Sequence, residues 1–368
     1  MDKKPLIGKC LAVGIILLFI GTCVISSLAQ DIEKPSQPTS RGGWLYVGGS
    51  GPGNYTKIQD AIDYASAGDT VFAYHHSTPY YENLRIDKSI CLIGEEKNTT
   101  IIDGNGIRNV TLVTADNVII SGFTLQHSGE YNQYGYSDSG IFLLSNGNTI
   151  TGNIIKDNRN NICTRDSMNN IIVHNVISNN LSNHSYDGID MSNSTKNRIE
   201  NNTISGSVAG IDIENGSENS ISDNVFINCL ILSIYFSSCT NNRISHNIII
   251  KNKIDLPTNI GYYSIWMFNS NNTLISENTF VNTKDNTHNI MMIDCFNNTI
   301  VRNNFFNVHP YVYFAESSHN VWNGNYWGRA RFLPKMILGH KGLDDRYPTA
   351  LNFDWHPAKE PYDIPLTS

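Results

Sequence analysis

Four acidic residues in two short stretches are the side chains of this sequence best suited to chemistry. Asp187 and Asp190 lie in Asp187-Gly-Ile-Asp190, and Asp212 and Glu214 lie in Asp212-Ile-Glu214, 22 residues after Asp190. Two carboxyl groups about 5 Å apart are the pair with which a retaining glycosidase works. The same four groups could instead supply the oxygen ligands of a Ca²⁺ ion. Both uses require the two stretches to lie side by side.

The two stretches belong to a repeat that would place them so. An eight-residue phrase recurs eight times between residues 148 and 327, with Asn at position one, Ile at three, Asn at six and a bulky apolar residue at eight. Thr273 and Trp322 replace the Asn and the Ile in single copies. The sixth-position Asn returns after 22, 27, 22, 23, 31, 25 and 22 residues. This period predicts a solenoid, in which each turn buries its apolar face against its neighbours.

The apolar residues predict which solenoid this is. Each phrase is preceded by a unit that reads apolar, variable, apolar, as in Ile189-Asp190-Met191 and Ile211-Asp212-Ile213. This period of two predicts strands. No Leu framework or helical arm of a leucine-rich repeat is present. We therefore predict an all-β fold, a right-handed parallel β-helix with coils of about 22–25 residues. The Asn residues are expected at the bends, where they tolerate left-handed backbone angles and form amide ladders.

Aligning the turns on the phrase predicts one exposed column of side chains. The outward residue seven positions before each phrase should stack on its neighbours, and the column reads Cys163, Asp190, Asp212, Tyr235, Trp266, Met291 and Tyr313. Adjacent strands lie about 4.8 Å apart, which would bring the two Asp side chains together. Segments 179–186 and 251–263, where the period lengthens, are the candidate walls of a groove.

Three interpretations of this column remain open. In the first, it is a glycan groove with Asp190 and Asp212 as catalytic acid and base, and with binding residues Asp187, Glu214, Tyr235, Trp266 and Tyr313. In the second, the four acidic residues hold Ca²⁺. In the third, the column is a solvated sheet face. A lyase is disfavoured, because such enzymes use an Arg or Lys base and the column contains neither.

Both ends of the predicted β-helix have recognisable caps. Residues 44–47 read as a strand, and Thr56-Lys-Ile-Gln59 reads as a capping box that begins a short helix. At the other end, Trp322, Tyr326 and Trp327 enlarge the core positions, as a plug would. The tail, residues 328–368, is expected to fold back over the last turn through Phe332, Leu333, Phe353 and Trp355.

The first 29 residues have the pattern of a secretory signal. Three Lys precede an apolar run over residues 11–25, and Ser27-Leu-Ala29 is a small-x-small cleavage site. An uncleaved membrane anchor is the alternative. Residues 30–43 read as a linker, which leaves residues 44–327 for the β-helix. The signal carries net +2 and the whole chain −7, so the mature chain is near −9. This charge argues against a nucleic-acid partner, and the signal predicts an extracellular or cell-surface location.

These motifs resemble those of the pectin-lyase-like β-helix superfamily, and within it the NosD-type repeat proteins. The resemblance covers residues 44–327 and rests on the Asn phrase, on Gly188-Ile-Asp and Gly210-Ile-Asp, and on Tyr55-Thr-Lys-Ile-Gln-Asp-Ala-Ile62 before Gly68-Asp-Thr-Val71. The tail motifs Asn325-Tyr-Trp-Gly328 and Phe353-Asp-Trp-His-Pro357 look like those of secreted members.

The superfamily includes polysaccharide lyases, glycoside hydrolases, passive surface proteins and a copper-maturation factor. The resemblance therefore implies three functions, which we keep as expectations. The first is carbohydrate binding or a structural role at the cell surface. The second is degradation of a polysaccharide. The third is copper handling, for which one turn offers the soft ligands His288, Met291, Met292 and Cys295. Met292 falls at a buried strand position, so this set is partial.

Overall fold

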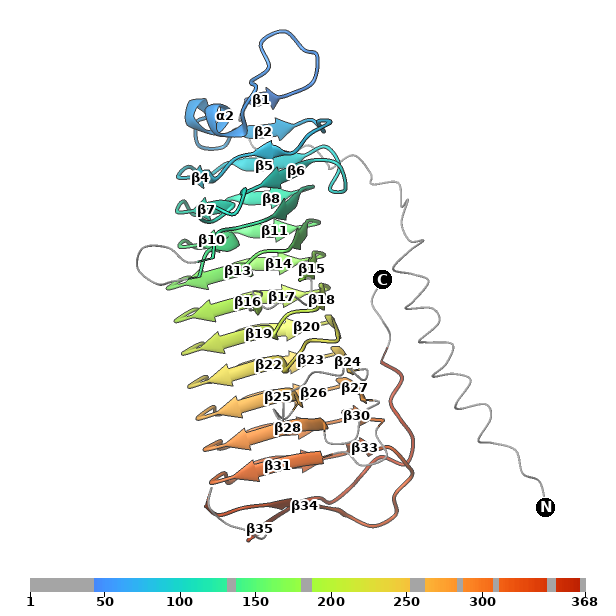
Figure 1. Cartoon of the computed structure of the whole chain (residues 1–368). Helices are drawn as coiled ribbons and strands as arrows, with labels where there is room; N and C mark the ends of the chain where they lie inside the picture. The colour runs from blue at the N-terminus through green and yellow to red at the C-terminus, as the bar shows by residue number, and fades with distance from the viewer. Residues whose placement is uncertain are drawn as a thin grey trace, which may run out of the picture. The chain divides into compact units, whose positions relative to one another are not determined.

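The computed structural model describes residues 43–130, 137–179, 187–251, 262–282, 287–306, 311–342 and 349–364. Within these ranges the chain forms a parallel β-helix with three sheets, here called A, B and C (Figure 1). The predicted fold class is therefore confirmed. The predicted signal, and the predicted linker apart from Gly43, lie outside the described residues.

Each turn contributes one strand to each sheet. In the phrase, the residues around position three form the strand of sheet A and those around position eight form the strand of sheet B. Sheet A contains β1 (Trp44–Val47), β2 (Thr70–Ala73), β5 (Cys91–Gly94), β8 (Ile119–Ser121), β11 (Thr149–Thr151), β14 (Ile171–Val173), β17 (Arg198–Glu200), β20 (Ser220–Ser222), β23 (Arg243–Ser245), β26 (Leu274–Ser276), β29 (Thr299–Val301), β32 (Val321–Asn323), β35 (Ala350–Asp354) and β34 (Lys335–Gly339).

Sheets B and C complete the turns. Sheet B contains β3 (Tyr80–Tyr81), β6 (Ile101–Asp103), β9 (Thr124–Gln126), β12 (Ile154–Lys156), β15 (Val176–Ser178), β18 (Thr203–Ser205), β21 (Val225–Ile227), β24 (Ile248–Lys251), β27 (Thr279–Asn282), β30 (Asn304–Phe305) and β33 (Tyr326–Trp327). Sheet C contains β4 (Leu84–Ile86), β7 (Thr111–Val113), β10 (Ser139–Leu143), β13 (Asn160–Arg165), β16 (Asp187–Ser192), β19 (Ala209–Glu214), β22 (Leu232–Ser237), β25 (Tyr262–Phe268), β28 (Thr287–Ile293) and β31 (Tyr311–Ala315).

The apolar positions of the repeat fill the bore, as predicted. Ile199, Ile221 and Ile244 at position three are completely buried, and so are Ile204 and Phe226 at position eight. The apolar residues that flank the column position in sheet C are also buried, apart from the half-buried Val312. Alternation along each short strand therefore sends every second side chain inward, and the column residue between them points outward.

The sixth-position Asn residues form a continuous ladder. Each side-chain amide donates to the carboxamide oxygen of the Asn one turn further on, at 2.9–3.2 Å, through Asn153, Asn175, Asn202, Asn224, Asn247, Asn278, Asn303 and Asn325. The predicted ladder is confirmed. The predicted left-handed angle at these Asn residues is wrong, because the residue before each Asn has positive φ, as His174 (57°) and Asp223 (58°) do.

The N-terminal helix is present, but the predicted capping box is not what caps it. Helix α2 (Ile58–Tyr64) has Lys57 as its N-cap residue, which makes no capping side-chain hydrogen bond. Instead, the carboxylate of Glu82 accepts hydrogen bonds from the N–H groups of Ile58 and Gln59, at 2.8 and 2.9 Å. A residue of the first turn therefore satisfies the free helix donors. Within the described ranges, no helix is both long enough and apolar enough to cross a bilayer.

The C-terminal plug is confirmed, whereas the expected packing of the tail is only partly correct. Trp322, Tyr326 and Trp327 are buried. The tail adds β35 and β34 to sheet A, and these two strands pair antiparallel. Phe332, Leu333 and Trp355 are exposed, which contradicts their predicted place over the last turn, and Phe353 is half-buried. Ile337 of β34 packs inward instead.

Candidate functional site

Sheet C brings the predicted column into register. Cys163 pairs with Asp190, Asp190 with Asp212, Asp212 with Tyr235, Tyr235 with Trp266, Trp266 with Met291 and Met291 with Tyr313. The register follows from the repeat, because each sheet C strand enters its turn at the same distance from the phrase. Strands β16 and β19 thus hold the two acidic stretches side by side.

The column is less exposed than the sequence predicts. Cys163 is buried, and Asp190, Asp212, Tyr235 and Trp266 are half-buried. Glu214, at the end of β19, is exposed. Of the predicted walls, segments 179–186 and 251–263, residues 180–186 and 252–261 lie outside the described residues.

Asp190 has a set of neighbours that the sequence did not reveal. Its Oδ2 accepts a hydrogen bond from Nδ2 of Asn160 at 3.0 Å, and Sγ of Cys163 donates to it at 3.7 Å. An Nη atom of Arg165 lies 3.9 Å from the same oxygen. The predicted absence of a basic residue holds for the column itself but not for its surroundings, since Arg165 lies on β13 two residues after Cys163. Burial raises the pKa of Asp190, and Arg165 opposes that rise.

Asp187 lies at the start of β16 and is tied to the neighbouring strands. Its Oδ1 accepts a hydrogen bond from the backbone N–H of Ala209 at 3.2 Å, and its own N–H donates to Oδ1 of Asn160 at 3.2 Å. Burial and the nearby charge of Asp190 raise the pKa of Asp187 to about 7. Near neutral pH this carboxyl group is therefore protonated about half of the time.

Asp212 is the most perturbed acid of the face. Burial and the charges of Asp187, Asp190 and Glu214 raise its pKa to about 8. Its Oδ1 is buried and has no hydrogen-bond partner among the described residues. The Asp190–Asp212 pair therefore combines one carboxyl group that has a cationic neighbour with one that keeps its proton at neutral pH. Pairs with such separated environments are typical of acid and base roles.

Aromatic side chains continue the face beyond the acidic residues. The rings of Tyr235 and Trp266 meet edge to face at 5.5 Å, and Tyr263 lies 5.0 Å from Trp266. Nε1 of Trp266 is buried without a hydrogen-bond partner among the described residues. His288 stacks on Tyr263 at 5.3 Å. Alignment of the turns on the repeated phrase predicted Tyr235 and Trp266 at this face. It did not predict Tyr263 and His288, because these two residues lie outside the column position.

We call this surface the acid–aromatic face, and its residues are Asp187, Asp190, Asp212, Glu214, Arg165, Tyr235, Tyr263 and Trp266. Tyr313, which the sequence also predicts to bind, lies two turns beyond Trp266 in the same column. Its ring is 6.4 Å from that of His288.

The soft side chains suggested for copper do not converge on one point. Met292 and Cys295 are buried in the core, whereas Met291 lies on the outer side of β28 and His288 stacks on Tyr263. Burial raises the pKa of Cys295 to about 11, and its Sγ donates to backbone carbonyls. A thiol held protonated is a poor copper ligand. This set therefore does not fit a copper ion. Across the described residues, no three His, Cys, Asp or Glu side chains gather closely enough to hold a metal.

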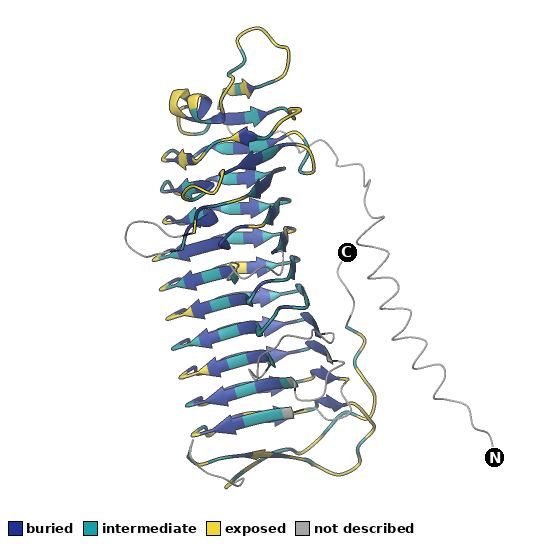
Figure 2. Cartoon of the chain, viewed as in Figure 1, coloured by how far each residue is buried: buried dark blue, intermediate teal, exposed yellow. Residues whose placement is uncertain are grey.

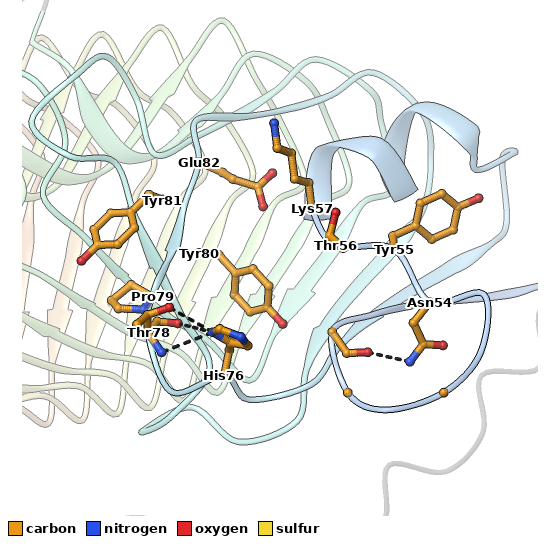
Figure 3. Close-up of a pocket in the computed structure, with 13 residues that line it drawn as sticks. Asn54, Tyr55, Thr56, Lys57, His76, Thr78, Pro79, Tyr80, Tyr81 and Glu82 are labelled. Atoms are coloured by element: carbon orange, nitrogen blue, oxygen red, sulfur yellow. Dashed lines mark hydrogen bonds between the residues drawn. The ribbon is translucent and has the colours of Figure 1, made fainter.

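A cavity of about 420 Å³ lies apart from the face, at the N-terminal end of the β-helix. Figure 3 shows His76 and Tyr80 on one side of it and Thr56 and Lys57 on the other. Nδ2 of Asn54 donates to the carbonyl of Gly48 and closes the loop at its rim. The cavity contains no residue of the acid–aromatic face.

Solved structures with this fold include proteins of several kinds. The chain is similar to an alginate lyase from Paenibacillus sp., with TM-score 0.55 and 16% identity, covering 77% of this chain and 95% of that one. It is also similar to PfbA, a surface adhesin of Streptococcus pneumoniae (TM-score 0.53, 13% identity, 82% and 95% covered). DFA-IIIase from Arthrobacter chlorophenolicus in complex with GF2 gives TM-score 0.54 and 12% identity (77% and 94% covered). These identities show a shared fold alone.

Comparison of sequences is more specific. A search of curated proteins finds no match. The family described as periplasmic copper-binding protein (NosD) matches residues 62–260. The match begins in helix α2 and runs through the turns that carry the acidic stretches, and it covers more than half of the 368 residues. This chain therefore belongs to the NosD family of parallel β-helix proteins.

Proposed function

We propose that the acid–aromatic face binds a glycan outside the cytoplasm. The observation that carries the proposal is two buried polar atoms that have no hydrogen-bond partner in the described part of the chain, the acceptor Oδ1 of Asp212 and the donor Nε1 of Trp266. Tyr235 lies between these two residues in the same column. Two turns separate them, roughly 10 Å along the axis. Sugar hydroxyl groups both donate and accept hydrogen bonds, and sugar rings pack on aromatic faces.

The charge of the face favours a neutral or amino sugar. The face contains four acidic residues and one Arg. It keeps an excess of negative charge even when Asp212 is protonated and the Asp187 carboxyl group is protonated in half of the molecules. A polyuronate would meet repulsion there, whereas a cationic amino group would be attracted. The fold neighbours lend general support, because an alginate lyase, a surface adhesin and an enzyme in complex with GF2 share this scaffold.

Binding is tested with a panel of neutral, amino and acidic oligosaccharides against the exported protein and its Trp266→Ala variant. The loss of one aromatic contact is expected to cost about 1 kcal/mol or more, a five-fold or larger rise in Kd. Tyr81→Ala is the control, since Tyr81 is exposed at the N-terminal end of the β-helix. Equal affinities for both variants, or no binding by the unsubstituted protein, would reject the proposal.

A second candidate function, hydrolysis of a polysaccharide, has support from the Asp190–Asp212 pair. Asp212, protonated at neutral pH, would donate its proton to the leaving glycosidic oxygen. Asp190, beside Arg165, would act as the carboxylate partner that attacks the sugar or activates water. Release of reducing sugar should then fall by about 10³-fold or more in Asp212→Asn while binding is retained. Asp166→Asn, at an exposed acid that directly follows β13, is the control.

Ca²⁺ and copper are the other candidate ligands. A Ca²⁺ ion would require the four carboxylates to move closer together, because no three of them lie close enough in the described structure to hold one ion. If it binds, chelator should lower the melting temperature and Asp190→Asn should do the same. Copper binding, which the family description names, has no converging soft-ligand set at His288 and Met291, so we propose a glycan as the ligand of this face.

A further inference from the structure

The C-terminal end of the β-helix exposes several large apolar side chains. Phe332 is 83% exposed and Leu333 is 77% exposed, both in the segment that joins β33 to β34. Trp355, just after β35, is 62% exposed. In Figure 2 the segments around β34 and β35 carry long exposed stretches. We call residues 328–342 and 349–359 the C-terminal tip. Contiguous exposed apolar patches on soluble proteins mark interaction sites.

The apolar side chains of the tip result from strand alternation. In β34, Ile337 is buried, while Met336 and Leu338 on either side of it are exposed. Leu338 pairs with Leu351 of β35, which is also exposed. One face of the β34–β35 hairpin therefore packs on the last turn, whereas the opposite face presents the exposed side chains of Met336, Leu338 and Leu351. A hairpin that only closed the bore would place polar residues on that outer face.

The same tip is strongly cationic in an acidic protein. Residues 328–342 contain Arg329, Arg331, Lys335 and Lys341 and no acidic residue, although the chain has net charge −7. Burial and the charge of Arg329 lower the pKa of Arg331, and burial and the two Arg residues lower that of Lys335. No salt bridge among the described residues involves these four. These four positive charges therefore have no counter-charge among the described residues.

We propose that the C-terminal tip docks on the surface of an anionic lipid bilayer. Phe332 and Leu333 would enter the interface between headgroups and acyl chains, and the Arg and Lys residues would contact anionic headgroups. Nζ of Lys359 already lies over the ring of Phe332, 5.2 Å from its centroid. A second copy is a poorer occupant, because each tip contains five basic residues and one acidic residue, Asp354, so two tips facing each other would oppose one net positive charge with another.

Vesicle co-sedimentation tests the proposal with the exported protein. One set of vesicles contains phosphatidylcholine alone. The other contains phosphatidylcholine and phosphatidylglycerol at a ratio of roughly 7:3, so that its surface is anionic enough to attract basic segments. Binding is expected on the anionic vesicles and should weaken at high salt, since screening shortens the range of the attraction. The double variant Phe332→Ser with Leu333→Ser, and separately Arg329→Glu with Arg331→Glu, should each lower the bound fraction by tenfold or more.

Matched controls separate the tip from other surfaces. Ile107→Ser removes an apolar side chain that is 53% exposed near the other end, and Lys196→Glu reverses an exposed charge on a middle turn. Neither should change binding. All four variants should melt like the unsubstituted protein, because the substituted side chains are exposed, apart from the half-buried Arg331, whose Nε has no hydrogen-bond partner among the described residues. Equal binding of the tip variants and the controls would overturn the proposal.

A fluorophore placed on the tip distinguishes binding there from binding through the N-terminal apolar segment. Leu333→Cys is made in a Cys91→Ser background, because Cys91 is only half-buried, whereas Cys163, Cys229, Cys239 and Cys295 are buried and label slowly. Labelled with an environment-sensitive fluorophore, it should shift to the blue on anionic vesicles. Vesicle binding without this shift would place the contact elsewhere. A dimer in sedimentation velocity that the Phe332 and Leu333 double variant abolishes, with no effect on vesicles, would assign the tip to contact between copies and would also overturn the proposal.

Discussion

The carboxylate of Asp354 accepts hydrogen bonds from both the backbone N–H and the side-chain amide of Asn325, at 2.9 and 3.1 Å. Asn325 is the last member of the sixth-position ladder, so Asp354 occupies the place of the next Asn. The indole of Trp327 donates to the same oxygen at 3.0 Å. Because a carboxylate only accepts, it satisfies the final amide of the ladder and requires no further turn.

Removing this carboxylate should destabilise the protein strongly. Asp354→Ala leaves the buried donors of Asn325, Trp327 and Gly324 without acceptors, and we expect a loss of about 3 kcal/mol or more in the free energy of unfolding. Denaturant unfolding followed by circular dichroism measures it. Asp363→Ala, at an exposed site in the same tail, should change stability little. Similar losses for both variants would contradict the assigned role of Asp354.

The bore should respond to Ile221 in graded steps. Ile221→Val should cost about 0.5–1.5 kcal/mol and Ile221→Ala about 2–5 kcal/mol, because Ile221 is completely buried between stacked turns. Ile221→Asp should prevent folding, since it buries an unpaired charge. Solubility and thermal melting report the series. A folded Ile221→Asp protein with a normal melting temperature would be incompatible with the described core.

The raised pKa of Asp212 predicts a pH-dependent stability. The folded state holds the proton up to about pH 8, whereas the unfolded chain releases it near pH 4. The contribution of this group is therefore present below about pH 4 and is lost as pH rises through 8. Asp187, with a pKa of about 7, acts in the same direction.

Replacing Asp212 by Asn should remove that dependence, because Asn is a neutral mimic of the protonated acid. We expect Asp212→Asn to raise the free energy of unfolding by about 1 kcal/mol or more at pH 8 and by little at pH 4. Melting temperatures across this range measure the difference. Asp60→Asn, at an exposed site, should leave the pH profile unchanged. A destabilised Asp212→Asn variant at pH 8 would instead favour a bound cation.

Export is predicted to remove the first 29 residues. Protein collected outside the cytoplasm should begin at Gln30 in N-terminal sequencing, because Ser27-Leu-Ala29 fits the small-x-small rule. Ala29→Phe should block cleavage. Leu28→Phe should not, because the position between the two small residues is unrestricted. Finding the exported chain with its N-terminal segment intact would favour the membrane anchor.

The repeat by itself determined the β-helix, the bore and the alignment of the column. Ile221 could be placed inside, and Asp190 beside Asp212, because every turn of a parallel β-helix pairs equivalent positions with its neighbours. Once the phrase is aligned, these contacts follow from counting residues. The Asn ladder follows in the same way, although the left-handed angle lies one residue earlier, where His174 and Asp223 show it.

Only the tertiary structure decided the contacts between residues that share no repeat position. Arg165 approaches Asp190, and Glu82 caps helix α2, through side chains that reach sideways or across a non-repeating loop. The pKa of Asp212 depends on how neighbouring atoms exclude water, which spacing does not encode. The exposure of Phe332 was also decided by tertiary packing. Trp327 and Ile337 of β34 are buried at this end whereas Phe332 is exposed, and a tail without a repeat does not encode which of its apolar residues packs inward.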